Sequence, residues 1–283
     1  MRHSENGHAA PLPSRTADAP AVDYDLPIEH ILQPRLLTCA PTDSIFTAAE
    51  RMHAAHCSSI LVMEGETAVG IWTEHDALAV DLDDPGAFST PIEQVMSSPV
   101  RTLSCRVSVG EAALRFKQER VRHYLVVDDE GAHKGILTQS DVVHNQGVEY
   151  FVLLRNVDSI LNAPPLKLPA SASLADAARA MRESQCDAAV VENDDGELGI
   201  LTERDIVRLI CQQKTQGNVW DAASHPLICV AAGEPLYHAR NVFVANGIRH
   251  LGVINSRGRL KGLVTYADIL ASIEHDYVSE LQK

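Results

Sequence analysis

The sequence predicts an α/β protein, of the α+β type, built from four tandem repeats. The first observation is a motif that occurs four times: glycine, two apolar residues, threonine, two variable residues and aspartate. The second is its spacing, because the motif glycines lie 65, 64 and 63 residues apart. The third is that each copy ends the same succession of a helical apolar stripe and two short apolar segments. A period this regular indicates tandem structural units. The motif glycines are Gly70, Gly135, Gly199 and Gly262.

The first repeat shows the plan of each unit. Turn and cap residues occupy positions 41–44. An amphipathic helix is predicted next, because apolar residues recur at spacings of three and four. These residues are Ile45, Ala48, Ala49 and Met52. Residues 58–63 and 68–72 predict two strands, and the turn between them makes a hairpin. Thr73 is predicted to open another helix.

The other three repeats follow the same plan. Their helical stripes are Val109, Ala112, Ala113 and Phe116, then Leu174, Ala177, Ala178 and Met181, then Leu236, Ala239 and Phe243. Arg240 replaces the second alanine of the last stripe, where its aliphatic stem can lie along apolar surface. The predicted hairpins pair 124–127 with 135–137, 188–191 with 199–201, and 251–254 with 262–264.

Composition limits the classes of partner. With 45% hydrophobic and 22% charged residues, the composition is that of an ordinary globular protein. The formal net charge of −14 argues against nucleic acid, since binding a phosphate backbone requires a basic face. It does not exclude a small anion in a local basic pocket. No apolar run approaches the roughly 18–20 residues that cross a membrane, so no membrane insertion is expected.

Cysteine and histidine positions give no metal site. The six cysteines form no C-x-x-C pair, which argues against a zinc site or a thioredoxin-type motif. Scattered reduced thiols fit the cytosol, so we expect a cytoplasmic protein. His53 and His56 have helical spacing but no third ligand, and they indicate surface histidines rather than a metal site.

The repeats predict two domains, each made of two units. Residues 1–22 lack an apolar core, do not resemble a signal peptide and are expected to be disordered. A unit of about 60 residues buries little core alone, so pairing lets two sheets cover each other. The expected modules are 23–147, with repeats at 28–85 and 91–147, and 148–273, with repeats at 156–213 and 218–273. A helical connector at 148–154 lies at their boundary, and 274–283 is expected to be a C-terminal helix or linker.

The repeat plan and the motif resemble CBS domains, which pair into Bateman modules. The resemblance covers about residues 28–273. It implies an α/β fold, modules that stack into a disc, and adenine nucleotides or related adenosyl ligands bound between paired repeats. The segment 272–281 is similar to connectors that precede diguanylate cyclase or phosphodiesterase output domains in bacterial signalling proteins.

The motif threonine and aspartate allow two interpretations. Thr-x-x-Asp at a helix start is a capping box, in which both side chains satisfy backbone N–H groups. The resemblance implies nucleotide contacts at the same positions, and a helix N-terminus attracts phosphate. One aspartate cannot serve both roles fully, so we expect only some sites to be occupied. The candidate residues are Thr73, Asp76, Thr138, Asp141, Thr202, Asp205, Thr265 and Asp268.

Basic residues near the hairpins are candidate phosphate ligands. The even repeats carry Arg-His pairs, for which the resemblance implies a place at the shared cleft, the alternative being a solvated sheet edge. Arginine suits phosphate through bidentate hydrogen bonds. Asp187 occupies this region of the third repeat and would repel phosphate, which Arg204 could offset. Lys167 is a further phosphate candidate, with a solvated surface role as the alternative. The Arg-His pairs are Arg122-His123 and Arg249-His250.

These features predict a non-catalytic regulatory sensor that binds AMP, ADP or ATP between paired repeats and needs no other cofactor. The alternative is an oligomerisation platform with empty clefts. An enzyme is not expected, since the sequence has no nucleophile–base constellation, glycine-rich phosphate loop or metal cluster. The expected partners are the adenosyl ligand and either a second copy of the chain or an output domain.

Overall fold

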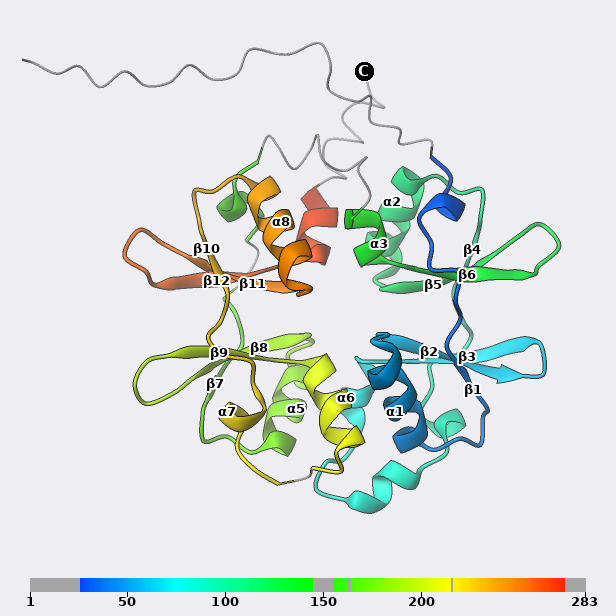
Figure 1. The fold of residues 1–283 in the computed structure, drawn as a ribbon, viewed down its shortest axis with the longest axis horizontal. Coiled ribbons are helices and arrows are strands. Elements are labelled where there is room, and N and C mark those ends of the chain that lie inside the picture. The colour runs from blue at the N-terminus through cyan, green and yellow to red at the C-terminus, as the bar shows by residue number, and fades with distance from the viewer. Residues whose placement is uncertain (1–25, 145–154, 162–163, 215, 273–283) are drawn as a thin grey trace, which may run out of the picture.

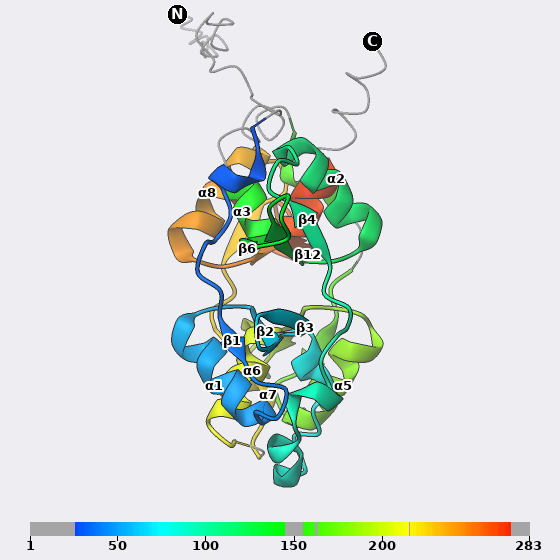
Figure 2. The same ribbon diagram turned by 90° about the vertical axis from the view of Figure 1, so that its right-hand side faces the viewer.

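The computed structural model describes residues 26–144, 155–161, 164–214 and 216–272. Four small sheets lie around a common centre, with helices above the upper two sheets and below the lower two (Figure 1). Figure 2 shows the same ring from its edge. This is the mixed α/β fold that the repeats predict. The predicted disordered segment 1–22, the connector 148–154 and the segment 274–283 lie outside the described residues.

Every repeat folds into a three-stranded sheet. In the first, β1 (Thr38–Cys39) pairs in parallel with β2 (Ser59–Glu64), which pairs antiparallel with β3 (Thr67–Thr73). Helix α1 (Ile45–Ala55) joins β1 to β2, because parallel strands need a crossover connection. The hairpin β2–β3 confirms the predicted hairpin.

The other three sheets have the same strand order and directions. The second repeat contains β4 (Thr102–Ser104), α2 (Val109–Glu119), β5 (His123–Val127), β6 (His133–Thr138) and α3 (Gln139–His144). The third contains β7 (Lys167–Pro169), α5 (Leu174–Glu183), β8 (Ala188–Glu192), β9 (Leu198–Thr202) and α6 (Glu203–Cys211). The fourth contains β10 (Cys229–Ala231), α8 (Leu236–Asn246), β11 (His250–Ile254), β12 (Leu260–Thr265) and a helix over 266–272. Short helical turns are η1 (Ile28–His30), η2 (Asp76–Ala79), η3 (Pro85–Ser89), η4 (Ile92–Gln94), η6 (Val157–Ile160) and α7 (Val219–Ala222).

The four predicted stripes form the buried faces of α1, α2, α5 and α8. Three of these helices begin at a serine whose Oγ accepts a hydrogen bond from the N–H three residues on, at 3.1–3.2 Å. Arg240 is buried at 7% exposure, and its Nε donates to the carbonyl of Val143 at 3.0 Å. The guanidinium thereby satisfies a carbonyl in the last turn of α3.

Two features differ from the prediction. The first strand of each sheet is not predicted, because two or three residues are too few to show an alternating pattern. The predicted helix after Thr73 is wrong: the chain forms only the 3-10 turn η2 before an extended Val80. The aspartates and the proline of residues 81–85, immediately beyond this turn, favour a change of direction over a continued helix.

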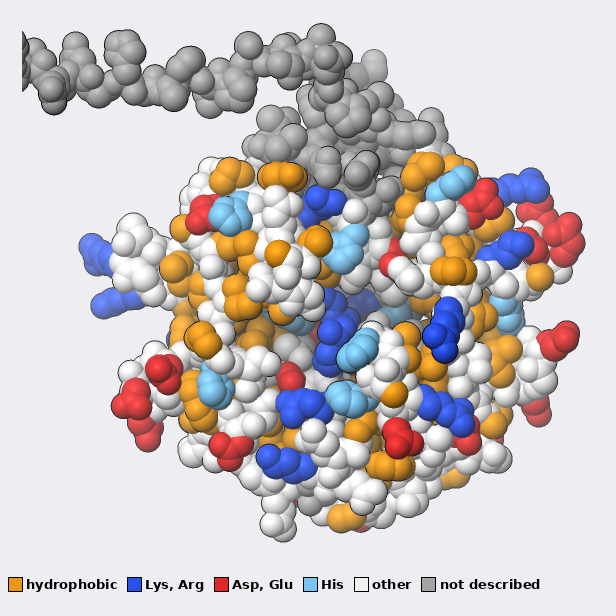
Figure 3. Space-filling model, viewed as in Figure 1, with side chains coloured by type: hydrophobic (Ala, Val, Ile, Leu, Met, Phe, Trp, Pro, Cys, Tyr) orange, Lys and Arg blue, Asp and Glu red, His pale blue; other side chains and the backbone are white. Residues whose placement is uncertain are grey.

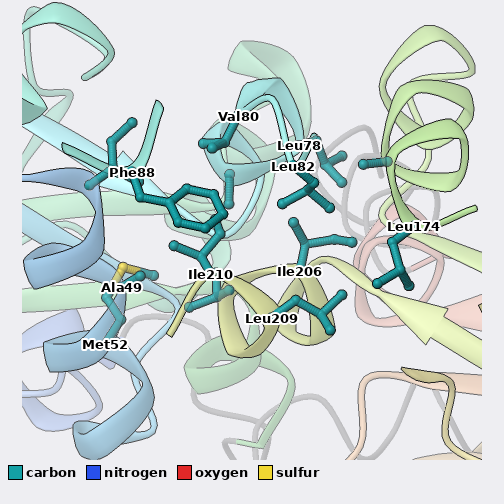
Figure 4. Packing of buried hydrophobic residues seen from close by; sticks show 14 of the residues in the cluster. Ala49, Met52, Leu78, Val80, Leu82, Phe88, Leu174, Ile206, Leu209 and Ile210 are labelled. Carbon is teal, nitrogen blue, oxygen red and sulfur yellow. The ribbon is translucent and has the colours of Figure 1, made fainter. Parts of the chain in front are cut away.

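Helices of different modules pack on one another and form two separate cores. One core joins the first and third repeats, where α1, α5, α6 and η2 meet (Figure 4). Met52 of α1 and Ile210 of α6 are fully buried there. The other core joins the second and fourth repeats and contains Phe116 and Phe243. Complete burial of such side chains contributes about 1.5–3 kcal/mol each, so these cores hold the two modules together.

Within a module, the contact is between sheets. Leu61 and Ile71 of the first repeat pack against Leu125 and Ile136 of the second. The segments before β1, β4 and β10 also cross to the partner sheet. Gln33 N donates to the Ile136 carbonyl at 2.8 Å, and Ile136 N donates back at 2.9 Å. Ser97 bonds to Ile71 and Ser224 to Ile200 in the same way.

This crossing explains the motif glycine. A Cβ at Gly135 would lie 2.3 Å from the carbonyl oxygen of Gln33, and one at Gly70 would lie 2.1 Å from Met96 Sδ. At Gly199 the nearest atom, Ser224 O, would be 3.1 Å away. The glycine therefore marks the place where the partner's leading segment lies against the hairpin.

Candidate functional site

The motif threonine and aspartate form the same hydrogen bonds in every repeat. Asp76 Oδ2 accepts from Thr73 N at 2.8 Å and from Thr73 Oγ1 at 2.7 Å. The same two bonds join Thr138 to Asp141, Thr202 to Asp205 and Thr265 to Asp268, at 2.6–2.9 Å. One carboxylate oxygen is thus committed locally in each motif, as the capping interpretation requires.

The second carboxylate oxygen has a different partner in three of the motifs. Asp76 Oδ1 accepts from Ser97 Oγ at 3.2 Å, and Asp141 Oδ1 accepts from Gln33 Nε2 at 2.9 Å. Asp205 Oδ1 instead accepts from the Arg208 guanidinium at 2.8 Å. The bond at Asp205 joins two charged groups, whereas those at Asp76 and Asp141 come from neutral donors.

A cleft of about 960 Å³ brings two of the four motifs together. Thr73 and Asp76 line one half, while Thr265 and Asp268 line the other. This volume lies in the range of small-molecule sites. A smaller cavity near the centre of the ring is lined by Thr138 and Thr202 and by both Arg-His pairs. The structure therefore brings ten candidate residues to the walls of these two cavities. Asp141 and Asp205 do not line either cavity, although each is hydrogen-bonded to a threonine that does. The ten residues are Thr73, Asp76, Thr138, Thr202, Thr265, Asp268, Arg122, His123, Arg249 and His250.

Two glutamates connect the modules at the centre. Glu74 of the first repeat accepts a hydrogen bond from Arg204 Nε of the third at 3.1 Å and pairs with Arg249 of the fourth. Glu203 of the third repeat lies 2.9 Å from Arg122 of the second. His75 Nδ1 of the first repeat lies 2.6 Å from the same carboxylate. Both glutamate side chains are only 4% exposed, so these ion pairs are largely shielded from water.

The two histidines of the Arg-His pairs have unlike partners. His123 Nε2 lies 2.8 Å from Ser58 Oγ, whereas His250 Nε2 lies 3.0 Å from Asp187 Oδ1. Ser58 and Asp187 occupy the same position in the first and third repeats, since each carbonyl accepts from the backbone N–H of the central glutamate. The substitution of aspartate for serine adds a negative charge to one side of the centre only.

Glu203 and Asp187 are ionised at neutral pH. Burial raises the pKa of Glu203, but the hydrogen bond from His75 and the charge of Arg122 outweigh it and hold the pKa below its ordinary value. Burial likewise raises the pKa of Asp187, and the nearby His250 and Arg122 outweigh it and lower the pKa. On the face shown in Figure 3, basic side chains gather toward the middle of the ring.

Sequence reasoning misses the two central glutamates. Each directly follows the motif threonine of an odd repeat, while the even repeats have Gln139 and Tyr266 there. That alternation is a signal visible in the sequence. Of the remaining candidates, Arg204 binds Glu74. Lys167 is exposed on β7 with Nζ 3.4 Å from Glu192, and its role as a phosphate ligand stays a prediction.

His123 makes stability depend on pH. Burial, followed by the charges of Arg122 and Arg249, lowers the pKa of His123 to about 3. An unfolded histidine titrates near about 6.5, so the unfolded state binds more protons below that pH. The stability due to neutral His123 is complete above the unfolded pKa and is lost as pH falls. His75 acts oppositely, because its hydrogen bond to Glu203 raises its pKa.

We expect His123→Asn to remove this acid sensitivity. Urea unfolding at about pH 5.5 and about pH 7 measures it, and the variant should lose about 1.3 kcal/mol less than the parent on acidification. His133→Asn, at the partly exposed first residue of β6, serves as the control. Equal acid losses in the parent and the His123 variant contradict this account.

The repeats match a known protein family. The CBS domain family matches residues 18–83, 92–147, 157–212 and 219–275, which together make up most of the chain. The chain belongs to the CBS-domain family. It carries four CBS domains in tandem, CBS1 to CBS4, which correspond to the four repeats.

Two archaeal relatives come from Methanocaldococcus jannaschii. The structure of MJ1225, described as a candidate archaeal homologue of g-AMPK, matches with a TM-score of 0.77 at 22% identity, over 87% of this chain and 99% of that chain. In sequence, MJ1225 is 26% identical over 208 residues, which are 67% of this chain and 74% of MJ1225. The uncharacterized protein MJ1404 is 26% identical over 191 residues, 62% of this chain and 45% of its own length. This chain thus spans less than half of MJ1404.

One enzyme shares part of the sequence. Inosine-5'-monophosphate dehydrogenase of Mycobacterium tuberculosis is 35% identical over 86 residues, which are 30% of this chain and 16% of the enzyme. Within the described ranges, no helix has the length and apolar character to span a bilayer. The same residues contain no group of three or more histidine, cysteine, aspartate or glutamate side chains that could hold a metal ion.

Proposed function

We propose that this CBS-domain chain is a non-catalytic regulatory sensor that binds adenine nucleotide, of the AMP, ADP or ATP type, between paired domains. One observation carries the proposal: Thr73–Asp76 and Thr265–Asp268 line a single cleft of about 960 Å³. A threonine hydroxyl and a carboxylate suit ribose hydroxyl groups, because each can accept a hydrogen bond from them. The description of MJ1225 as a g-AMPK homologue agrees with a regulatory nucleotide role.

The central ion pairs offer a route from binding to a change of shape. A phosphate that reaches Arg122 competes with Glu203, since guanidinium binds phosphate and carboxylate in the same bidentate manner. Arg122 belongs to CBS2 and Glu203 to CBS3, so this exchange weakens a contact between modules. A ligand shifts a conformational equilibrium only through such a difference in interaction between two states.

Thermal unfolding with added nucleotide tests the proposal. At ten times the dissociation constant, a ligand stabilises the native state by about 1.4 kcal/mol. For a chain of this size, that raises the melting temperature by about 3–5 °C. The double variant Asp76→Asn/Asp268→Asn should reduce the shift while preserving an oxygen for the threonine bonds.

Asp176→Asn is the matched control. Asp176 occupies the same place in the first turn of α5 and accepts from Ser173 Oγ at 2.8 Å, but it is 65% exposed. The Asp176→Asn variant should show the same nucleotide-induced rise in melting temperature as the parent. If AMP, ADP and ATP give no shift at millimolar concentration, the sensor proposal fails, and an oligomerisation platform with empty clefts becomes the better account.

The finer organisation is part of the same proposal. We assign the modules to 23–147 and 148–273 and expect the chain to act in the cytoplasm. The partner of the chain would be a second copy, forming a homodimer, or an output domain. An output domain would receive the signal through the segment 272–281, which resembles connectors to diguanylate cyclase or phosphodiesterase domains. The candidate phosphate ligands Lys167 and Arg204 belong to this proposal as well.

A further inference from the structure

The two halves of the 960 Å³ cleft are built from equivalent elements. CBS2 supplies one wall of the Asp76 half, and CBS3 supplies the matching wall of the Asp268 half. Arg101 and Leu166 stand at the same point of these walls. The carbonyl of Arg101 accepts from the second strand of its sheet at 2.9 Å, and that of Leu166 does so at 2.8 Å.

Three further positions correspond. Arg120 and Gln185 follow the first helix of their domains, and both have φ of 53°. Arg122 and Asp187 each precede the next strand, which begins with His123 in CBS2 and with Ala188 in CBS3. All of these residues line the cleft. The matched pairs are therefore Arg101 with Leu166, Arg120 with Gln185, Arg122 with Asp187, and His123 with Ala188.

The chemistry of the two walls is opposite. At these four positions the Asp76 half has three guanidinium groups and an imidazole, which can donate charge-assisted hydrogen bonds to a phosphate. The Asp268 half has one carboxylate and no basic side chain at the same positions. A phosphate placed there would meet Asp187, and like charges at close range repel.

We propose that the Asp76 half selects adenosine phosphates, and that the Asp268 half selects an adenosyl compound without phosphate, whose 5′ substituent is neutral or cationic. This inference rests on the proposed function and assigns a ligand class to each half. The motif threonine and aspartate provide the same ribose contacts in both halves. The residues at the four wall positions determine which 5′ substituent is accepted.

Binding of AMP and of adenosine distinguishes the two walls, because the two compounds share base and ribose and differ in the phosphate. The variant Arg101→Leu/Arg120→Gln places in the Asp76 half the residues that the Asp268 half has at two of the four wall positions. Both arginines are exposed, so the change should not disturb folding. In isothermal titration, the dissociation constant of this variant for AMP should rise about tenfold or more, because one or more charge-assisted bonds to the phosphate are lost. Its dissociation constant for adenosine, which has no phosphate, should stay within about twofold of the parent value.

The reciprocal variant is Leu166→Arg/Gln185→Arg, which should add an AMP site to the Asp268 half. The parent should lose AMP binding with Asp76→Asn and keep it with Asp268→Asn. If AMP and adenosine weaken by the same factor in Arg101→Leu/Arg120→Gln, or if Asp268→Asn removes AMP binding, the assignment is overturned although the sensor proposal stands. If neither AMP nor adenosine binds the parent chain, the assignment of the two halves and the sensor proposal both fail.

Discussion

Replacing Gly135 by alanine should destabilise the protein by about 3 kcal/mol, the upper range of overpacking in a well-packed site. The new Cβ would lie 2.3 Å from Gln33 O and 2.5 Å from Leu32 Cδ1. Backbone cannot swing aside as a side chain can. Moving Gln33 also strains its two hydrogen bonds with Ile136, each of which contributes about 1 kcal/mol.

Chemical denaturation of three alanine variants checks this reasoning. At Gly70 the obstructing atoms belong to the flexible side chain of Met96, so the loss should be smaller than at Gly135. At Gly233 no atom lies within 4 Å of the new Cβ, and that variant should unfold like the parent. A Gly135 variant as stable as the Gly233 variant would show that the crossing segment is not held against the hairpin.

Replacing Glu203 by alanine should cost about 3 kcal/mol, the lower end of the range for breaking a buried ion pair. Its carboxylate is 4% exposed and holds Arg122 and His75 together. Without it, the ion pair that the described residues leave to Arg122 is the one with Asp187, whose nearest oxygen is 3.6 Å away. The lower end applies because Arg122 is 31% exposed and water can solvate part of its charge.

Urea unfolding of matched variants measures this loss. Glu192→Ala breaks the exposed pair with Lys167, in which both side chains are about half exposed, and should change stability by less than about 1 kcal/mol. The double variant Glu203→Ala/Arg122→Ala should recover part of the loss, because it removes the cation left without its main partner. If Glu203→Ala and Glu192→Ala are equally mild, the central pairs do not join the modules.

Helices and hairpins could be predicted from the sequence because their causes are local. The stripe of Ile45, Ala48, Ala49 and Met52 results from the helical period, and all four side chains are buried in α1. The helix predicted after Thr73 shows the limit of this approach. Thr73 ends β3, and the 3-10 turn η2 begins three residues later at Asp76. The length of a helix depends on the residues beyond its first turn, and here the chain turns at residues 81–85.

The candidate site was only partly predictable. Thr-x-x-Asp could be located, and its capping geometry is present in all four motifs. The sequence does not predict which motifs share a cleft, because a motif specifies the local structure where it lies and not which domain packs opposite it. Asp76 and Asp268 meet one cleft although 192 positions separate them.

The sequence by itself determined the four repeats, their buried stripes and hairpins, and the positions of the motif side chains, since each depends on residues within one unit. The packing of the four repeats into a ring decided which side chains of different repeats meet. It brought Glu74 to Arg249 and Glu203 to Arg122, pairs formed between different modules. Such contacts depend on how the apolar faces of α1 and α6 pack together, which is a property of the assembled chain rather than of any single repeat.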